Sequence, residues 1–283
     1  MTDLRVAEKL AWLVKSAVRE DTEIAFLTCE EKLYWARHQA SGPQPTSAIV
    51  KLVQGLYEIY PDSAQKLVRR RIYATTKPTE MCRGMVKVAA RRLTAPITPV
   101  DHNDLSFADL TFIEITAPKP PLPPPTFEGQ STTLGEPAHF MRAVFELAQQ
   151  VPREKPLYKC SRPIAAILVS EKNEILAYAI NTNVSNRTQH AEVNLIQSYF
   201  LTTKQGLPSR STLYTTLKPC RMCAAMIWHM AEDPENLRVF YGAHDPGPQA
   251  RHTILDAKSP DRRDACRRAG VPHLLDLQLE ELL

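Results

Sequence analysis

Two short motifs in the second half of the chain carry side chains that could hold a metal ion and move a proton. Pro219-Cys220-Arg221-Met222-Cys223 places two thiols on one side of the first turn of a predicted helix. His190-Ala191-Glu192 opens another predicted helix and sets a carboxylate two residues after an imidazole. The positive N-terminal end of a helix favours the thiolate form of cysteine, which is the form that binds metals.

These side chains together predict a catalytic Zn²⁺ site with His190, Cys220 and Cys223 as ligands. Three protein ligands leave one position open, which distinguishes catalytic zinc from closed structural zinc. Zinc at an open site lowers the pKa of water toward about 7. Glu192 can reach that water without being a ligand, so we expect it to be the catalytic acid and base.

Other interpretations of the two motifs are weaker. A lone Cys-x-x-Cys can be redox-active, structural or incidental, and most His-x-Glu pairs are solvated helix residues. A structural zinc site would need a fourth ligand, and the chain has no second Cys-x-x-Cys. Cys160 and Cys266 could supply one, but isolated cysteines are more often small buried apolar residues. The joint occurrence of both motifs, each after a strand, favours the catalytic interpretation.

The elements that position these motifs alternate between helix and strand, which predicts an α/β layered domain over 136–283. About 30 residues with a predicted helix separate the last two strands, and a helical crossover makes them parallel. The predicted helices span 137–151, 190 onward, 221–231 and 258–269, and the predicted strands span 164–169, 175–180, 212–217, 237–242 and 273–277.

Residues 1–135 differ from the rest of the chain in their residue pattern. Six prolines among residues 117–125 favour an extended spacer, so we expect a linker over 117–135. Residues 1–116 are expected to form a mostly α-helical, basic accessory domain, with no internal repeat visible in the sequence. The expected elements are helices over 3–18 and 46–60, helices starting near 61 and near Thr79, and a strand within 108–115.

Composition limits the class of protein. The chain is 43% hydrophobic and 23% charged, which is typical of a globular protein, and its net charge of +4 is mild. It has no apolar run of the roughly 18 residues that a membrane helix needs, so no membrane partner is expected. The first residues do not look like a secretory signal, and the six cysteines are scattered. We therefore expect free thiols and a cytoplasmic protein.

Residues 136–250 resemble the cytidine and tRNA adenosine deaminase superfamily, in which His-x-Glu and Pro-Cys-x-x-Cys form the signature of zinc base deaminases. The likeness rests on His190–Asn194, Thr215–Ala224 and the strand and loop at Arg238–Asp245. It implies a cytidine-deaminase-like three-layer α/β/α fold with a five-stranded mixed sheet. It also implies Zn²⁺ as cofactor, hydrolytic removal of an amino group and possible pairing into a homodimer. The layout is similar to a bacterial branch with an extra N-terminal globular domain.

The resemblance also implies which residues line the base pocket, namely Asn181, Asn183, Ala191, Val193 and Pro219. Asn181 stands roughly where the tRNA adenosine deaminases carry a substrate-binding asparagine, but Asn183 could serve instead. The loop that leads from these residues to His190 is shorter than expected for those enzymes. The identity of the base is therefore left open between adenosine and cytidine.

A basic segment in the N-terminal half bears on the substrate. Residues 63–92 contain nine Lys or Arg and one acid, and such clusters bind phosphate backbones. The alternative is a solvated face. The sequence thus predicts a deaminase of a base in RNA, with tRNA among the candidate substrates. Deamination of free nucleotides or bases, and a catalytically silent nucleic-acid-binding partner subunit, are the alternatives. The residues expected to bind nucleic acid are Arg69, Arg70, Arg71, Arg91 and Arg92.

Overall fold

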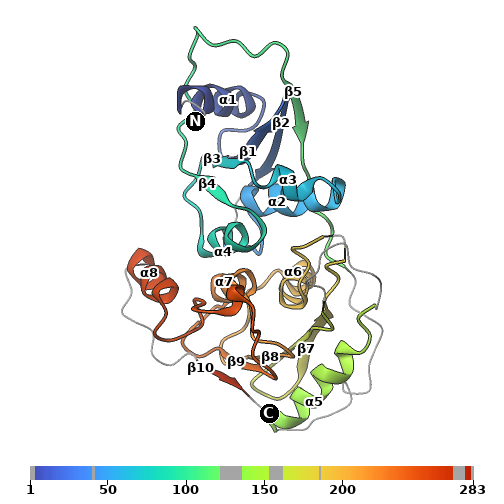
Figure 1. Ribbon diagram of the computed structural model, residues 1–283. Coiled ribbons are helices and arrows are strands. Elements are labelled where there is room, and N and C mark those ends of the chain that lie inside the picture. The colour runs from blue at the N-terminus through green and yellow to red at the C-terminus, as the bar shows by residue number, and fades with distance from the viewer. Residues whose placement is uncertain are drawn as a thin grey trace. The chain divides into compact units, whose positions relative to one another are not determined.

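The computed structural model describes residues 4–39, 42–121, 136–152, 162–184, 186–269 and 278–281. The chain divides into two compact units, Met1–Lys119 and Pro120–Leu283 (Figure 1). Most of the linker expected over 117–135 lies outside the described residues. Among the residues described, no helix is both long and apolar enough to cross a membrane.

The C-terminal unit is built on a mixed five-stranded sheet with the order β10-β9-β8-β6-β7. Strands β6 and β7 form the predicted hairpin, and β6 also pairs antiparallel with β8. Strands β8, β9 and β10 run parallel. The elements are α5 (Pro137–Ala148), β6 (Ala165–Val169), β7 (Ile175–Ile180), α6 (Ala191–Thr203), β8 (Thr212–Thr215), α7 (Arg221–Met230), β9 (Arg238–Tyr241), the short 3₁₀ turn Pro248–Ala250, α8 (Pro260–Ala269) and β10 (Gln278–Glu281).

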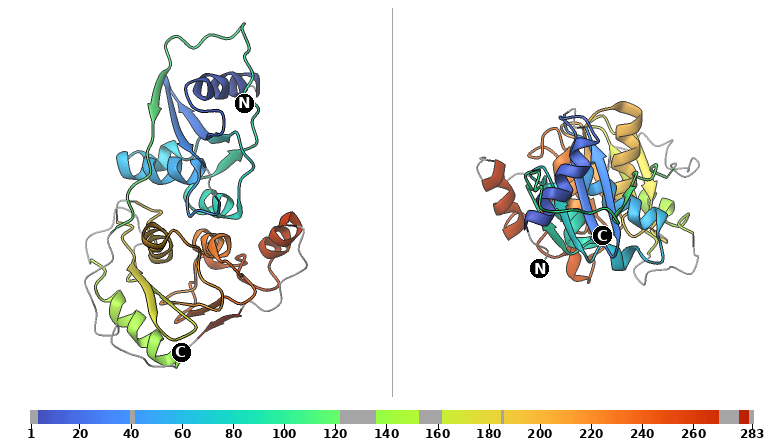
Figure 2. Two further views of the ribbon diagram at one scale, coloured as in Figure 1. Left: turned by 180° about the vertical axis from the view of Figure 1, so that it is seen from behind. Right: turned by 90° about the horizontal axis from the view of Figure 1, so that it is seen from above.

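The α/β/α layering predicted for this unit is confirmed. Helix α5 covers one face of the sheet and helices α6 and α7 cover the other, as both side views show (Figures 1 and 2). The predicted parallel pairing of the last two strands is also confirmed. The segment 273–277, predicted as the last strand, lies outside the described residues, and the observed strand β10 begins at Gln278.

The core between α5 and the sheet explains how this helix is held. Val144 and Leu147 of α5 pack on Ile167 and the aromatic ring of Tyr214, and all of them are buried. Burying side chains of this size contributes about 1.5–3 kcal/mol each. Helix and sheet approach closely enough that a Cβ atom on Gly242 would lie 2.5 Å from the ring of Phe145. A larger residue just after β9 would therefore have to displace the Phe145 ring.

The N-terminal unit differs from the expectation of a mostly α-helical domain. It contains a second five-stranded sheet, with the order β4-β3-β1-β2-β5, so the prediction is wrong. Strand β1 is buried at almost every position, and a continuous apolar run does not show the alternation that reveals a strand. The strands are β1 (Glu23–Cys29), β2 (Lys32–His38), β3 (Arg71–Ala74), β4 (Arg92–Thr94) and β5 (Thr111–Glu114).

The helices of this unit were predicted correctly. Ser47 caps α2 by accepting a hydrogen bond from the Val50 amide at 3.2 Å, and Thr79 caps α4 through the Cys82 amide at 3.3 Å. Such caps satisfy amide groups that the first helical turn leaves free. Strand β5 confirms the strand expected within 108–115. The helices are α1 (Leu4–Ser16), α2 (Ala48–Ile59), α3 (Ala64–Leu67) and α4 (Glu80–Ala89).

Candidate active site

The three predicted metal ligands converge at the starts of two neighbouring helices. His190 immediately precedes α6, Cys220 immediately precedes α7, and Cys223 lies in the first turn of α7. The Nδ1 atom of His190 lies 3.6 Å from the Sγ of Cys220 and 3.5 Å from the Sγ of Cys223. The two sulfur atoms are 3.5 Å apart. One imidazole nitrogen and two sulfurs therefore face a common point.

This donor set fits Zn²⁺. Around a tetrahedral zinc with Zn–S near 2.3 Å and Zn–N near 2.0 Å, neighbouring ligand atoms are separated by about 3.5–3.8 Å. The three distances observed here lie close to that range. Within the described ranges this is the one cluster of three His, Cys, Asp or Glu side chains placed to bind a metal. Cys160 lies outside those ranges, and Cys266 is a buried free thiol of α8.

Glu192 points at the same cluster from the first turn of α6. Its Oε2 atom accepts a hydrogen bond from the Sγ of Cys223 at 3.3 Å, and the side chain is only 3% exposed. Burial raises the pKa of Glu192 to about 7, and the negative charge of Cys220 adds to the shift. A carboxylate with a pKa near neutrality can both accept and return a proton under ordinary conditions.

Cys220 has the opposite shift. The hydrogen-bond contact with the Cys223 sulfur lowers the pKa of the Cys220 thiol well below its ordinary value, and the neighbouring His190 imidazole contributes further. A thiolate at this position is the form that binds a metal. The site thus presents a negatively charged sulfur and a protonatable carboxylate side by side.

The predicted substrate residues lie around this cluster on α6 and the segments before the two helices. The Nδ2 atom of Asn181 donates to the Oδ1 of Asn183 at 2.9 Å, and both side chains are buried. The Oδ1 atom of Asn181 is buried and has no hydrogen-bond partner among the described residues. Ala191, Val193 and Pro219 are buried. Their contact with substrate remains a prediction.

Asn194, which the sequence analysis did not single out, fixes the loop in front of His190. Its Nδ2 atom donates to the Ile180 carbonyl at 2.9 Å and to the Thr182 Oγ1 at 3.0 Å. The Thr182 amide in turn donates to the Gln189 carbonyl at 3.1 Å, which closes the loop. The segment that carries the predicted substrate asparagines is therefore tied to the helix that carries Glu192.

Two ion pairs that the sequence analysis missed hold the residues on either side of Cys220. The Nζ atom of Lys218 lies 2.6 Å from the Oδ1 of Asp256, and Arg221 lies 3.5 Å from Asp261. The partners are separated by about 40 residues in sequence, so no local signal reveals them.

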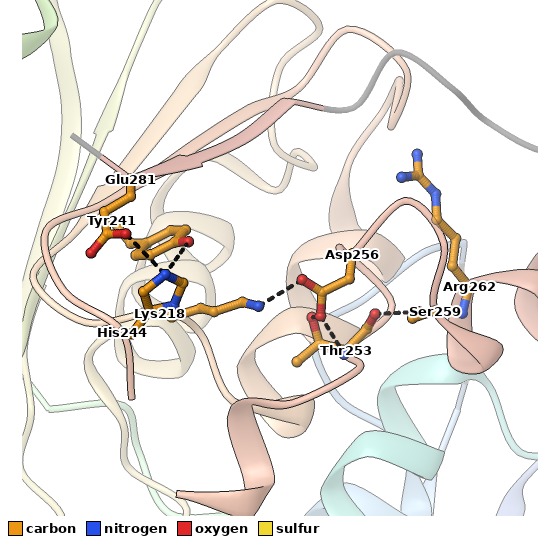
Figure 3. Close-up of polar contacts among 8 residues, drawn as sticks. All are labelled: Lys218, Tyr241, His244, Thr253, Asp256, Ser259, Arg262 and Glu281. Atoms are coloured by element: carbon orange, nitrogen blue, oxygen red, sulfur yellow. Dashed lines mark hydrogen bonds and ion pairs between the residues drawn. The ribbon is translucent and has the colours of Figure 1, made fainter. Parts of the chain in front are cut away.

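The segment that supplies both carboxylates is itself ordered by hydrogen bonds (Figure 3). The Oδ2 atom of Asp256 accepts from the Thr253 amide at 2.7 Å, and the Ser259 hydroxyl donates to the Thr253 carbonyl at 2.5 Å. The Arg262 amide then donates to the Ser259 Oγ at 3.0 Å. These hydrogen bonds hold the carboxylate of Asp256 in place independently of its ion pair with Lys218.

The five predicted nucleic-acid residues belong to the N-terminal unit. Arg71 is the first residue of β3 and Arg92 is the first residue of β4. Arg69 and Arg70 precede β3, Arg91 precedes β4, and all five side chains are exposed.

Comparison with known proteins places the likeness in the C-terminal unit. Residues 155–266 match the family described as Bd3614-like deaminase. The chain is 32% identical over 114 residues to a tRNA-specific adenosine deaminase of Agrobacterium fabrum, covering 40% of this chain and 69% of that protein. It is 33% identical over 85 residues to a tRNA-specific adenosine deaminase of Haemophilus influenzae, covering 29% of this chain and 47% of that protein. The chain therefore spans about half the length of the latter relative.

Solved structures are similar over about half of the chain. A structure from studies of A-to-I editing by tRNA:A34 deaminases is 27% identical, with 50% of this chain and 98% of that chain covered and a TM-score of 0.37. A guanine deaminase of Nitrosomonas europaea is 20% identical, with 58% of this chain and 88% of that chain covered and a TM-score of 0.38.

Proposed function

The chain belongs to the cytidine and tRNA adenosine deaminase superfamily, and on that premise we propose that it is a hydrolytic, zinc-dependent deaminase of a nucleobase in RNA. The observation that carries the proposal is the convergence of His190, Cys220 and Cys223, with the Glu192 carboxylate 3.3 Å from the Cys223 sulfur. Zinc bound to these three residues would act as a Lewis acid and make water a competent nucleophile at neutral pH.

The reaction exchanges an amino group for oxygen. The oxygen of water forms a bond to C6 of adenine or C4 of cytosine, the bond to the exocyclic nitrogen breaks, and ammonia leaves. Glu192 takes a proton from the water, passes it to the ring nitrogen, and delivers a proton to the departing amino group. Burial of Glu192 shields these transfers from bulk solvent.

The substrate class is supported by the names of the relatives. Three relatives at 32–33% identity are tRNA-specific adenosine deaminases, which makes adenosine in tRNA the first substrate to test and cytidine the second. Asn181 and Asn183 are the side chains we propose for contact with the nucleoside, since the free Oδ1 of Asn181 can accept a hydrogen bond. Cytoplasmic location and a homodimer belong to the same proposal.

The decisive experiment treats total tRNA with the purified protein and with its Glu192→Ala variant, followed by sequencing for A-to-G and C-to-T changes. We expect changes at defined positions that vanish in the variant while its zinc content is retained. Glu235→Ala, a substitution of an exposed glutamate in the same unit, is the control that should edit normally.

Two other results would replace the proposal. Ammonia release from free nucleotides or bases, with tRNA unchanged, would assign the chain to the free-nucleotide deaminases. RNA binding by a zinc-loaded protein that releases no ammonia from any of these substrates would make it a catalytically silent partner subunit.

A further inference from the structure

The two units repeat one arrangement of helices and strands. In the N-terminal unit, β1 pairs antiparallel with β2 and with β3, and β3 pairs parallel with β4. In the C-terminal unit, β6 pairs antiparallel with β7 and with β8, and β8 pairs parallel with β9. Each unit begins with a helix, and a further helix precedes the third strand and another the fourth. The fifth strand differs, because β5 joins β2 whereas β10 joins β9, and helices α3 and α8 have no counterpart in the other unit.

The register between the first and third strands is the same in both sheets. Phe26 of β1 lies opposite Tyr73 of β3, and Ile167 of β6 lies opposite Tyr214 of β8. Taking these pairs as equivalent, the residue two positions after each tyrosine makes the same contact in both units. The Ile24 amide donates to the Oγ1 of Thr75 at 3.2 Å, and the Ala165 amide donates to the Oγ1 of Thr216 at 3.3 Å.

This register aligns residues 73–85 with residues 214–226 without a gap. Seven of the 13 aligned positions are identical: Tyr73 and Tyr214, Thr75 and Thr216, Lys77 and Lys218, Pro78 and Pro219, Met81 and Met222, Cys82 and Cys223, and Met85 and Met226. The helix starts before them align in the same way, since Ser47-Ala-Ile-Val-Lys-Leu-Val-Gln54 matches His190-Ala-Glu-Val-Asn-Leu-Ile-Gln197 at Ala, Val, Leu and Gln. The expectation of no internal repeat is therefore wrong. The repeat is hard to see in the sequence because the identities occupy two short segments that are separated by stretches of unequal length.

The alignment identifies the residues of the N-terminal unit that correspond to the metal ligands of the C-terminal unit. Ser47, Thr79 and Cys82 stand where the other unit has its histidine and two cysteines. They still meet, because the Cys82 sulfur lies 3.1 Å from the Ser47 hydroxyl and 3.2 Å from the Thr79 hydroxyl. Neutral hydroxyls are not the ligands that zinc prefers in proteins. Ile49 replaces the catalytic glutamate, so this cluster has no group to transfer a proton.

We propose that the N-terminal unit is a second copy of the deaminase fold that has lost its metal centre and its proton-transfer residue. Chemistry is then confined to the C-terminal unit. The backbone of the lost site has changed little at the second motif, since Thr79 has φ −71° and ψ 172° and Cys220 has φ −71° and ψ 171°. Two side-chain substitutions should therefore restore a metal site.

The test is to rebuild the site in the full chain and count bound zinc by mass spectrometry of the metal. Ser47→His with Thr79→Cys should raise the content from about one to about two zinc ions per chain. Adding Cys82→Ser to that variant should return it to one. In a Cys223→Ser background the rebuilt site should be the only one filled. A folded variant that still binds a single zinc would overturn the proposal.

Because histidine is larger than serine, the Ser47→His substitution can prevent folding, and a second variant with a smaller change is therefore measured as well. Ser47→Cys with Thr79→Cys changes side-chain volume less and offers three thiols, a ligand set found in zinc deaminases. Circular dichroism establishes that each variant is folded. The zinc count does not depend on enzymatic turnover. A failure of this proposal therefore leaves the deaminase proposal intact, and a failure of the deaminase proposal leaves this one intact.

A separate observation indicates what the N-terminal unit binds. Its two parallel strands β3 and β4 begin side by side, with Arg71 paired to Arg92. Arg69, Arg70 and Arg91 directly precede them, so five arginines, here called the arginine edge, gather at one end of the sheet. Their side chains are exposed, and none has an ion-pair partner within the part of the chain that the structure describes.

The arginine edge has the chemistry of a phosphate-binding surface. Guanidinium groups bind phosphate oxygens in pairs, and several unpaired cations together bind a polyanion. The C-terminal unit keeps two arginines at the equivalent positions, Arg210 and Arg238, and Arg210 is ion-paired with Glu171, so the full set of five arginines belongs to the N-terminal copy alone. Resting on the proposed function, we infer that the arginine edge binds the phosphate backbone of the RNA substrate.

Fluorescence anisotropy with labelled bulk tRNA and the full chain tests this inference. Arg70→Glu with Arg92→Glu should weaken binding at least tenfold and flatten the plot of log K against log salt by about two units. Arg19→Glu with Lys172→Glu makes the same charge change at other exposed positions and should have little effect. Equal affinity and slope for the two double variants would refute the inference, whether or not the RNA is deaminated.

Discussion

The starts of equivalent helices in the two units are stabilised by different means. In the N-terminal unit the Ser47 and Thr79 hydroxyls accept hydrogen bonds from amides of the first turn. In the C-terminal unit His190 and Cys220 occupy the same positions, and neither side chain caps its helix. A cap contributes about 1 kcal/mol. The catalytic copy gives up this stabilisation to present metal ligands, and the inert copy has it, which is the usual exchange between activity and stability.

The equivalent lysines before the two motifs differ in the same sense. Lys218 is 14% exposed and forms an ion pair with Asp256, whereas Lys77 is exposed. A partly buried charge with a fixed partner holds the chain in place, but an exposed one contributes little. Precise positioning is therefore built around the site that performs chemistry.

The largest expected difference between the units is the effect of replacing the aligned cysteines Cys223 and Cys82 on zinc binding. Cys223→Ser should abolish zinc binding and with it deaminase activity, because it removes one of three ligands. Cys82→Ser should leave both unchanged, since the Cys82 sulfur is hydrogen-bonded to the hydroxyls of Ser47 and Thr79. Metal content and ammonia release measure the outcome, and loss of zinc from the Cys82 variant would show that the N-terminal unit holds metal.

A smaller effect is expected from the ion pair beside Cys220. Asp256→Asn should weaken zinc retention by less than the roughly 10–100-fold loss that follows removal of a direct partner of a metal ligand, because Asp256 acts through Lys218, two residues before Cys220. The rate at which a chelator removes the metal, and the absorption spectrum of the cobalt-substituted protein, report the change. Asp264→Asn, at an exposed ion pair of α8, is the matched control. Equal release rates in both variants would remove Asp256 from the site.

Acid should destabilise the N-terminal unit through His38, which stands where the other unit has Asn181. Burial, with the nearby charge of Lys51, lowers the pKa of His38 to about 4. The unfolded chain therefore binds more protons below pH 6.5, and stability is lost as the pH falls toward 4. Unfolding by urea at pH 7 and pH 5 should show a loss of about 2 kcal/mol that His38→Asn removes. An unchanged pH dependence in the variant would contradict this assignment.

The smallest effect concerns the caps. Thr79→Ala should lower the free energy of unfolding by about 1 kcal/mol because an amide of α4 loses its acceptor. Ser63→Ala provides the comparison, since that exposed side chain makes no cap bond at the start of α3. If both variants unfold at the same urea concentration, the cap in the inert copy has no stabilising value.

Local patterns predicted the parts of the molecule that local chemistry determines. The i, i+3 spacing of Cys220 and Cys223 fixes two ligands on one helical turn, and the helices expected over 46–60 and from near Thr79 were predicted from residue pattern. Of the strands in the N-terminal sheet only β5 was predicted, and β1, for example, is buried on both faces and so lacks alternation. The Lys218–Asp256 pair depends on how distant segments pack, and the metal-free site could be recognised only after strand register aligned the two copies.

The doubled topology has a consequence for how the chain folds. Strands with the same pairing order occur twice, and tandem copies of one fold are prone to exchange equivalent elements during synthesis or refolding. Divergence of the strand sequences opposes this, because Phe26 and Trp35 in one hairpin are matched by Ile167 and Tyr178 in the other and fill different volumes. The N-terminal copy emerges from the ribosome first, so it can complete its own sheet before its competitor exists.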